Sequence, residues 1–204
     1  MTAPRTPDQF GPTGLRLYHK YGITFVDLTD GPEDLELLRR WRNHPEIQRW
    51  MVFREEITPE MQAAWFAALD TTREVYSIVW NRTEQIGLTQ LRNIDPIERS
   101  GEGGIILFKP EFQNGLYAHR AALAGMDWNF LHRGLETLHV TVRKINSRAR
   151  RLVKSLGYVL HDPDPAGDVL RGTVTREQYF EAAAKWRPIV RAEAEAEVGG
   201  VSEW

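Results

Sequence analysis

The sequence predicts an α/β (α+β) fold, in which a mixed, mainly antiparallel sheet of about seven strands carries helices on both faces. Segments with the apolar–polar alternation of strands are grouped in the first half of the chain. Beyond Leu116 the apolar period becomes that of a helix, and helices then alternate with short strands. Strands that follow one another directly tend to pair antiparallel, whereas a crossover helix permits a parallel pair, so we expect a mixed sheet.

The first half of the domain is predicted to contain a strand, two helices and three more strands. Residues 22–28 alternate as a strand, and Gly31-Pro32 begins a helix. A second helix begins at Thr58-Pro59, with an expected apolar stripe of Met61, Ala64, Trp65 and Leu69. The next three strands are expected at 75–80, 85–91 and 103–108, with turns between them.

The second half is predicted to alternate helices and strands. A long helix at 117–133 ends at Gly134, and a basic helix at 147–156 ends at Gly157. Short strands are expected at 138–142, 158–160 and 168–170. The last helix begins at a capping box formed by Thr175 and Gln178.

Length and composition indicate one ordinary globular domain. The chain has 204 residues, of which 42% are hydrophobic and 26% charged, and its formal net charge is −2. We expect a mobile N-terminal arm at 1–15, a single domain at 16–188 and a flexible C-terminal tail at 189–204.

The charge and the residue types exclude several classes of function. A near-neutral chain has no bulk attraction to nucleic acid or to a membrane, so we expect neither as a partner. The absence of cysteine excludes disulfides and a cysteine nucleophile, and suits a cytoplasmic protein. The six histidines lack metal-ligand spacing, so no metal is expected.

The connection between the strand at 103–108 and the helix at 117–133 carries the strongest chemical signal. The strand ends near Pro110, and a polar turn with Gly115 leads into the helix. Free backbone N–H groups and the positive end of the helix dipole make such a helix start suitable for an anion. An ordinary strand–turn–helix connection fits the local pattern as well.

Two motifs at this spacing resemble the GNAT superfamily of acyl-CoA-dependent N-acetyltransferases. The first matches the pyrophosphate loop of that superfamily, and its matching residues are Pro110, Gln113, Tyr117 and Ala118. The second matches its later Asn-x-x-Ala…Leu-Gly-Phe segment, through Asn146, Ala149, Leu152, Lys154, Leu156, Gly157 and Tyr158. The resemblance covers residues 22–170 and implies a GNAT-type fold with acetyl-CoA as co-substrate. It implies cofactor contacts at Leu107, Phe108, Gln113, Asn114, Gly115, Leu116, Tyr117, Ala118 and Asn146.

Three residues depart from the pattern of the superfamily. Leu116 replaces the central glycine of the loop, and Val153 replaces the tyrosine that often protonates the leaving thiolate. Thr141 stands where a glutamate is often found. The resemblance still implies that the backbone N–H of Phe108, or of its neighbour, stabilises the oxyanion. Glu102 is our candidate general base, with a solvated carboxylate as the alternative.

The segment at 41–51, WRNHPEIQRWM, resembles a segment of the sugar-nucleotide acetyltransferases of flagellin pseudaminic-acid synthesis, with related segments in the ribosomal-protein N-acetyltransferase branch. The resemblance implies that the acceptor substrate is bound by Arg42, His44, Met51 and Trp65. Aromatic and thioether groups suit a nucleobase, and a guanidinium suits a phosphate. Alternatively, Trp41 and Trp50 belong to the core and His44 caps a helix.

The function predicted from the sequence is N-acetylation, in which acetyl-CoA donates an acetyl group to a primary amine. The predicted acceptor is a nucleotide sugar, a UDP-linked 4-amino-dideoxy sugar of flagellin glycosylation. Protein N-terminal or small-amine acetylation is the first alternative, and an inactive acyl-CoA-binding module is the second. The sequence leaves a homodimer open. Arg120 and the basic helix at 147–156 are expected to meet phosphates of CoA or to be solvated.

Overall fold

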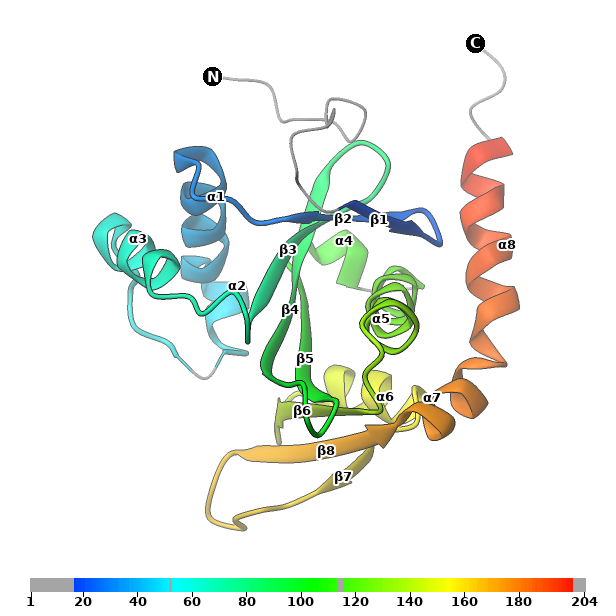
Figure 1. Cartoon of the computed structure of the whole chain (residues 1–204). Coiled ribbons are helices and arrows are strands. Elements are labelled where there is room, and N and C mark those ends of the chain that lie inside the picture. The colour runs from blue at the N-terminus through cyan, green and yellow to red at the C-terminus, as the bar shows by residue number, and fades with distance from the viewer. Residues whose placement is uncertain (1–16, 52, 114–115, 200–204) are drawn as a thin grey trace.

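The computed structural model describes residues 17–51, 53–113 and 116–199, and in this part of the chain eight strands form one sheet (Figure 1). The strands follow the order β1-β2-β3-β4-β5-β6-β8-β7 across the sheet. Their bounds are β1 (Leu17–Lys20), β2 (Ile23–Asp27), β3 (Val75–Trp80), β4 (Gln85–Asp95), β5 (Ser100–Leu107), β6 (Thr137–Arg143), β7 (Val159–His161) and β8 (Val169–Thr175).

Every pair of neighbouring strands is antiparallel except β5 and β6, which are parallel. The predicted mixed, mainly antiparallel fold is therefore confirmed. The helices are α1 (Pro32–Asn43), α2 (Pro45–Gln48), α3 (Pro59–Ala67), α4 (Pro110–Gln113), α5 (Tyr117–Asp127), a π-helix (Trp128–His132), α6 (Ser147–Ser155), α7 (Arg176–Ala183) and α8 (Trp186–Gly199).

The sheet separates two hydrophobic clusters, because alternate residues of each strand point to opposite faces. Helices α1, α2 and α3 cover one face, as Figure 1 shows, and their cluster includes Leu38, Ile47 and Trp80. Helices α5 and α8 lie on the other face, where the cluster includes Leu123 and Phe130. We call these the α1 face and the α5 face.

The sequence did not predict strand β1. It pairs with β2 through a tight hairpin whose two loop residues, Tyr21 and Gly22, have φ angles of 56° and 68°. Two successive positive φ angles are typical of the hairpin turn that matches strand twist, which usually contains Asn-Gly. A tyrosine in that position gives a weak sequence signal. The predicted arm at 1–15 lies outside the described residues.

The apolar stripe predicted for α3 is partly wrong. Met61 is 42% exposed and Ala64 is exposed, whereas Gln62 is only 1% exposed. Helix α3 turns its buried side at Gln62, Trp65 and Phe66 toward the α1 face. Because glutamine is polar, the sequence predicts that Gln62 is exposed. Its burial is visible only in the packed structure.

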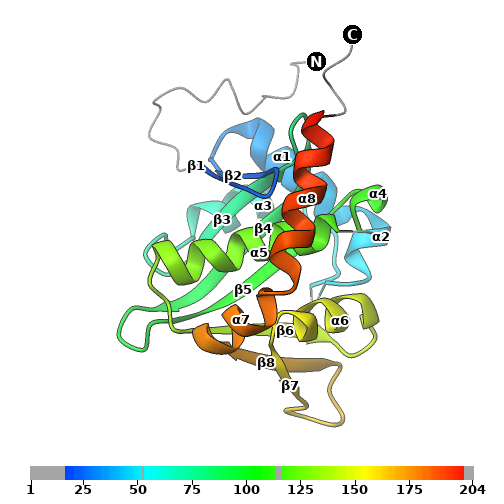
Figure 2. The same ribbon diagram turned by 90° about the vertical axis from the view of Figure 1, so that its right-hand side faces the viewer.

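The chain remains helical where the sequence predicted a tail from residue 189. Helix α8 continues to Gly199, and Figure 2 shows it crossing α5. Its Val190 is fully buried, and the carboxylate of Glu197 accepts a hydrogen bond of 2.7 Å from Arg120. Burial of these groups stabilises a segment whose alanine–glutamate repeats alone indicated only a fraying helix. Arg120 is itself fully buried, so of its two predicted alternatives the solvated one is wrong.

Candidate active site

The parallel strands β5 and β6 separate after a short paired stretch. Pairing joins Ser100, Gly101 and Glu102 of β5 to residues 137–139 of β6 and then stops. Beyond that point β5 continues to Leu107 and β6 to Arg143 without further pairing between them. A wedge-shaped gap therefore opens in the middle of the sheet, with unpaired backbone groups along its sides.

The backbone of β5 shows which groups face this gap. The N–H of Phe108 donates a hydrogen bond of 2.9 Å to the carbonyl of Ile86 in β4. Backbone groups of successive strand residues point to opposite sides, so those of Ile105 and Leu107 point toward β6. The prediction that the Phe108 N–H stabilises an oxyanion is therefore corrected, because that N–H is already bonded within the sheet. The N–H of the neighbouring residue Leu107 points toward the gap and could stabilise the oxyanion.

The outer end of the gap is bordered by α4 and α6. The side chain of Gln113 donates to the carbonyl of Leu107 at 2.9 Å, and its oxygen accepts from Arg148 at 2.8 Å. Arg148 of the basic helix thus reaches across to the loop that was predicted to bind pyrophosphate. Of that loop, Asn114 and Gly115 lie outside the described residues.

The first turn of α5 begins beside this border. Leu116 precedes the helix with an αR conformation, and Ala118 lies within the first turn. The hydroxyl of Tyr117 donates to Glu197 at 2.5 Å, so this side chain points toward α8. The N–H groups of the first turn have no acceptor within the helix. The backbone of α5 therefore suits an anion better than the Tyr117 side chain does.

Asn146 has a local role at the start of α6. Its side-chain oxygen accepts a hydrogen bond of 3.0 Å from the N–H of Ala149 and caps the helix. The predicted contact of Asn146 with the pantetheine arm would therefore have to use its NH₂ group. This contact stays a prediction.

The α1 face brings several of the predicted acceptor residues together. Trp41 stacks on Phe108, with ring centroids 4.4 Å apart, which agrees with a core role for this tryptophan. The guanidinium carbon of Arg42 lies 5.4 Å from the centre of the Trp65 ring. Trp65 in turn meets Tyr76 edge-on at 4.9 Å, and the half-buried Met51 packs against the same cluster.

Arg42 has no hydrogen bond or ion pair with any described residue, and its buried Nε has no partner. Burial disfavours the charged form and lowers the pKa of the guanidinium. The cation–π contact with Trp65 is its one described attraction to a ring. Gln62 of the adjacent helix α3 is also buried, and neither its Nε2 nor its Oε1 has a partner.

Two other predicted residues have partners of their own. Glu102 accepts hydrogen bonds from Arg92 and Asn93, each at 3.2 Å. His44 is exposed and accepts a hydrogen bond from the N–H of Glu46 at 3.3 Å, so it caps helix α2. The capping alternative for His44 is confirmed, whereas the general-base role of Glu102 stays a prediction.

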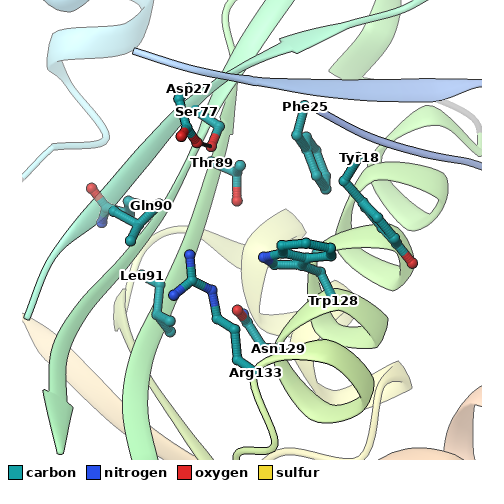
Figure 3. Close-up of a pocket in the computed structure, with 12 residues that line it drawn as sticks. Tyr18, Phe25, Asp27, Ser77, Thr89, Gln90, Leu91, Trp128, Asn129 and Arg133 are labelled. Atoms are coloured by element: carbon teal, nitrogen blue, oxygen red, sulfur yellow. Dashed lines mark hydrogen bonds between the residues drawn. The ribbon is translucent and has the colours of Figure 1, made fainter. Parts of the chain in front are cut away.

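A cavity on the α5 face lies apart from all these residues (Figure 3). Trp128 and Arg133 project into it from the π-helix region, opposite side chains of β2, β3 and β4. Ser77 donates a hydrogen bond of 3.4 Å to Asp27 in its wall. No residue predicted for the site lines this cavity, so the chemistry is assigned to the gap and the α1 face.

In the described ranges, no His, Asp and Glu side chains cluster in a way that could hold a metal ion. The same ranges contain no helix with the length and hydrophobicity needed to cross a membrane.

A parallel strand pair that opens into a gap, followed by a loop and a helix start, is the arrangement that the GNAT resemblance predicts. A family model for the acetyltransferase (GNAT) domain matches residues 25–159, more than half of the chain. The chain belongs to this family and is an acetyl-CoA-dependent N-acetyltransferase.

Among curated proteins, the chain is 29% identical to spermidine N(1)-acetyltransferase of Escherichia coli K12 over 127 residues, which are 62% of this chain and 68% of that protein. Among solved structures, it resembles spermidine N-acetyltransferase from Vibrio cholerae in complex with CoA and spermine, with a TM-score of 0.68 and 22% identity over 79% of this chain and 99% of that one. It also resembles RimJ of Mycobacterium smegmatis in complex with CoA-disulfide, with a TM-score of 0.64 and 17% identity over 84% and 91% of the two chains.

Sequence reasoning missed three side chains that the structure places at the site. Arg148 belongs to a basic run that gave a partial signal. Gln62 gave no such signal, because a glutamine outside the apolar stripe of a helix is expected to be exposed to solvent. Tyr158 was recognised as part of a motif, but its hydroxyl was assigned no role.

Proposed function

We propose that this acetyltransferase acts on the primary amine of a small molecule that also carries an anionic group, with a UDP-linked 4-amino-dideoxy sugar as the first candidate. The observation that carries the proposal is the unpaired guanidinium of Arg42 over the ring of Trp65. A partly buried charge without a partner is costly, so its retention is best explained by an anion that arrives with the substrate.

The surroundings of Arg42 suit a nucleotide. The Trp65 ring and the Met51 thioether offer flat or polarisable surfaces for a base, and a guanidinium can bind a phosphate through two N–H groups. These residues share the α1 face with Ile106 and Phe108 of the strand that borders the gap. An acceptor bound here would therefore present its amine toward the gap.

Spermidine is the second candidate, and the curated relatives favour it. A polyamine needs carboxylates that are free to pair with ammonium groups. On this face the carboxylate of Glu102 is bonded to Arg92, and that of Glu74 accepts from the hydroxyl of Tyr76 at 3.0 Å. Beside Arg42 the carboxylate of Glu102 is therefore already paired, and the guanidinium of Arg42 opposes the approach of a polycation.

The residues present fit the acetyl-CoA that the family uses. Ile105 and the N–H of Leu107 offer backbone groups to its pantetheine arm, and the first turn of α5 offers N–H groups to its diphosphate. Arg148 supplies a positive charge at the outer end. Acetyl-CoA supplies the thioester that the amine attacks, and the chain orients both reactants.

The test is a comparison of kcat/KM for three amines with saturating acetyl-CoA, measured by release of the CoA thiol and by the mass of the product. The amines are a UDP-linked 4-amino-dideoxy sugar, spermidine and a peptide with a free N-terminus. The proposal expects the sugar nucleotide to give the highest value. A higher value for spermidine or the peptide would overturn the acceptor assignment, and binding of acetyl-CoA without any turnover would favour the inactive module.

A further inference from the structure

The position where the family often has a catalytic tyrosine carries no proton donor in this chain. Val153 of α6 occupies it, and the half-buried valine packs against the core cluster of the α5 face. The sulfur of CoA still gains a proton when the C–S bond breaks, because an ordinary thiol is protonated at neutral pH. Another group beside the gap could supply it.

Three glycines of β5 show where space remains next to the gap. A Cβ on Gly101 would lie 2.9 Å from Leu91, and one on Gly104 would lie 2.7 Å from the amide of Gln90. A Cβ on Gly103 would have a single neighbour within 4 Å, the hydroxyl oxygen of Tyr158 at 3.9 Å. The space beside Gly103 is therefore open, and a phenol borders it. Gly103 is also the first residue of β5 beyond its last pair with β6.

Tyr158 is held firmly in this position. Gly157 precedes it with a φ angle of +94°, a conformation that favours glycine and turns the chain sharply after α6. The N–H of Tyr158 bonds to the carbonyl of Val153 at 3.1 Å, and a Cβ on Gly172 of β8 would lie 3.6 Å from its ring. The side chain is only 8% exposed.

The hydroxyl of Tyr158 makes no hydrogen bond with any described residue, so its proton is not engaged by the protein. Burial raises the pKa of this phenol well above the ordinary value, so it keeps its proton at every physiological pH. A neutral hydroxyl that faces an open space can donate to a negative charge that develops there.

We propose that Tyr158 is the catalytic proton donor of this acetyltransferase, protonating the sulfur of CoA from the inner end of the gap. This inference rests on the acetyl transfer itself and not on the identity of the acceptor. The amine nitrogen forms a bond to the thioester carbonyl carbon, and the C–S bond breaks with its electron pair on sulfur. The phenol gives its proton to sulfur, and a proton lost from the attacking amine returns to the phenolate through water.

The first test is Tyr158→Phe, which removes one oxygen and keeps the ring. We expect kcat to fall by about 10²- to 10⁴-fold, the usual contribution of a positioned acid, while the KM for acetyl-CoA changes little. The control is Tyr18→Phe, because the Tyr18 hydroxyl is buried without a partner and lies on the α5 face in the wall of the cavity, away from the gap. The control should leave kcat unchanged.

A second readout does not depend on turnover. A phenol that donates to sulfur stabilises the thiolate of bound CoA, so Tyr158→Phe should raise the pKa of that thiol in an ultraviolet titration of the complex. Val153→Tyr in the Tyr158→Phe background should restore part of kcat, because it places a phenol at the usual position. Should the Phe variant fail to fold, fluorotyrosine at position 158 should move the alkaline limit of kcat to lower pH.

Unchanged kcat and an unchanged thiol pKa in a folded Tyr158→Phe protein would overturn the proposal, as would fluorotyrosine without effect on the pH profile. These results are distinguishable from failure of the proposed function. In that case the parent protein itself would prefer spermidine or the peptide, or would acetylate none of the three amines.

Discussion

Two charges, the fully buried Asp127 on the α5 face and the half-buried Arg42 on the α1 face, differ in how fully they are paired. Asp127 of α5 is fully buried and accepts hydrogen bonds from Tyr21, Tyr179 and Arg187, with Lys20 at 2.6 Å. Arg42 of α1 has no hydrogen-bonding partner among the described residues.

This difference distinguishes a charged residue that stabilises the fold from one that binds a ligand. Burial opposes ionisation of Asp127, but hydrogen bonds from Arg187, Lys20 and Tyr179 outweigh it and hold the pKa of the carboxyl below its ordinary value. Such a group is satisfied inside the fold, so it joins α5 to the hairpin and to the C-terminal helices. Partial burial of Arg42 costs free energy, and no described residue offsets this cost with a hydrogen bond. An anionic ligand that binds Arg42 would offset it.

The largest expected change in stability is that caused by replacing Asp127, the paired charge. Asp127→Ala leaves Arg187 and Lys20 without their carboxylate, and breaking a buried pair in this way typically costs about 3–5 kcal/mol of unfolding free energy. Urea denaturation measures the loss. The control is Glu36→Ala, which removes an exposed carboxylate paired with Arg39 and should change stability little. A loss for Asp127→Ala no larger than that of the control would contradict the structural role of Asp127.

A smaller change in stability, a gain instead of a loss, is expected for Gln62 on the α1 face. Gln62→Leu replaces a buried amide without partners by an apolar side chain of similar size, and an unsatisfied buried polar group costs about 1–3 kcal/mol. The variant should therefore be more stable than the parent in urea, while its KM for the acceptor should rise. Lower stability would show that Gln62 is satisfied within the fold, and the contrast between the faces would weaken.

The smallest effect concerns pH. His119 of α5 stacks on Trp186 at 4.0 Å between ring centroids, and burial lowers the pKa of its imidazole. The unfolded chain therefore binds more protons as pH falls below the ordinary histidine pKa of about 6.5, and stability falls with it, by at most about 1.4 kcal/mol per pH unit.

Melting temperatures between about pH 7.5 and about pH 5.5 measure this effect. His119→Phe keeps an aromatic ring against Trp186 and removes the titration, so the variant should lose less stability on acidification than the parent does. Parallel pH curves for the two proteins would show that other groups dominate.

Most of the fold could be predicted from sequence, because period and turn chemistry are local signals. The strand at 75–80 and the capping box at Thr175 lie where the pattern indicates. The gap could be predicted only through the family resemblance, because strand separation depends on pairing that no local pattern records. Strand β1 and the ordered end of α8 were missed for a related reason, since both are stabilised by contacts with distant residues such as Arg120.

The site was predicted less completely than the fold. Arg42, Met51 and Trp65 were identified through the family resemblance, and the structure places all three against the α1 face. The direction of the Phe108 N–H follows from strand register, which the sequence does not contain. The hydroxyl of Tyr158 reaches β5 only because α6 and its glycine turn fold back against the sheet.

The most direct test of the contrast between the two faces is Arg42→Met, a change that keeps a long side chain against Trp65 and removes the charge. One comparison with the parent gives the KM for a UDP-linked amino sugar, the KM for acetyl-CoA and the unfolding free energy. Loss of a charge-assisted contact costs about 1.5–3 kcal/mol, so the acceptor KM should rise about tenfold to a hundredfold. The KM for acetyl-CoA should stay the same, and stability should be equal or higher. A less stable protein with an unchanged acceptor KM would contradict the assignment and make Arg42 a structural residue.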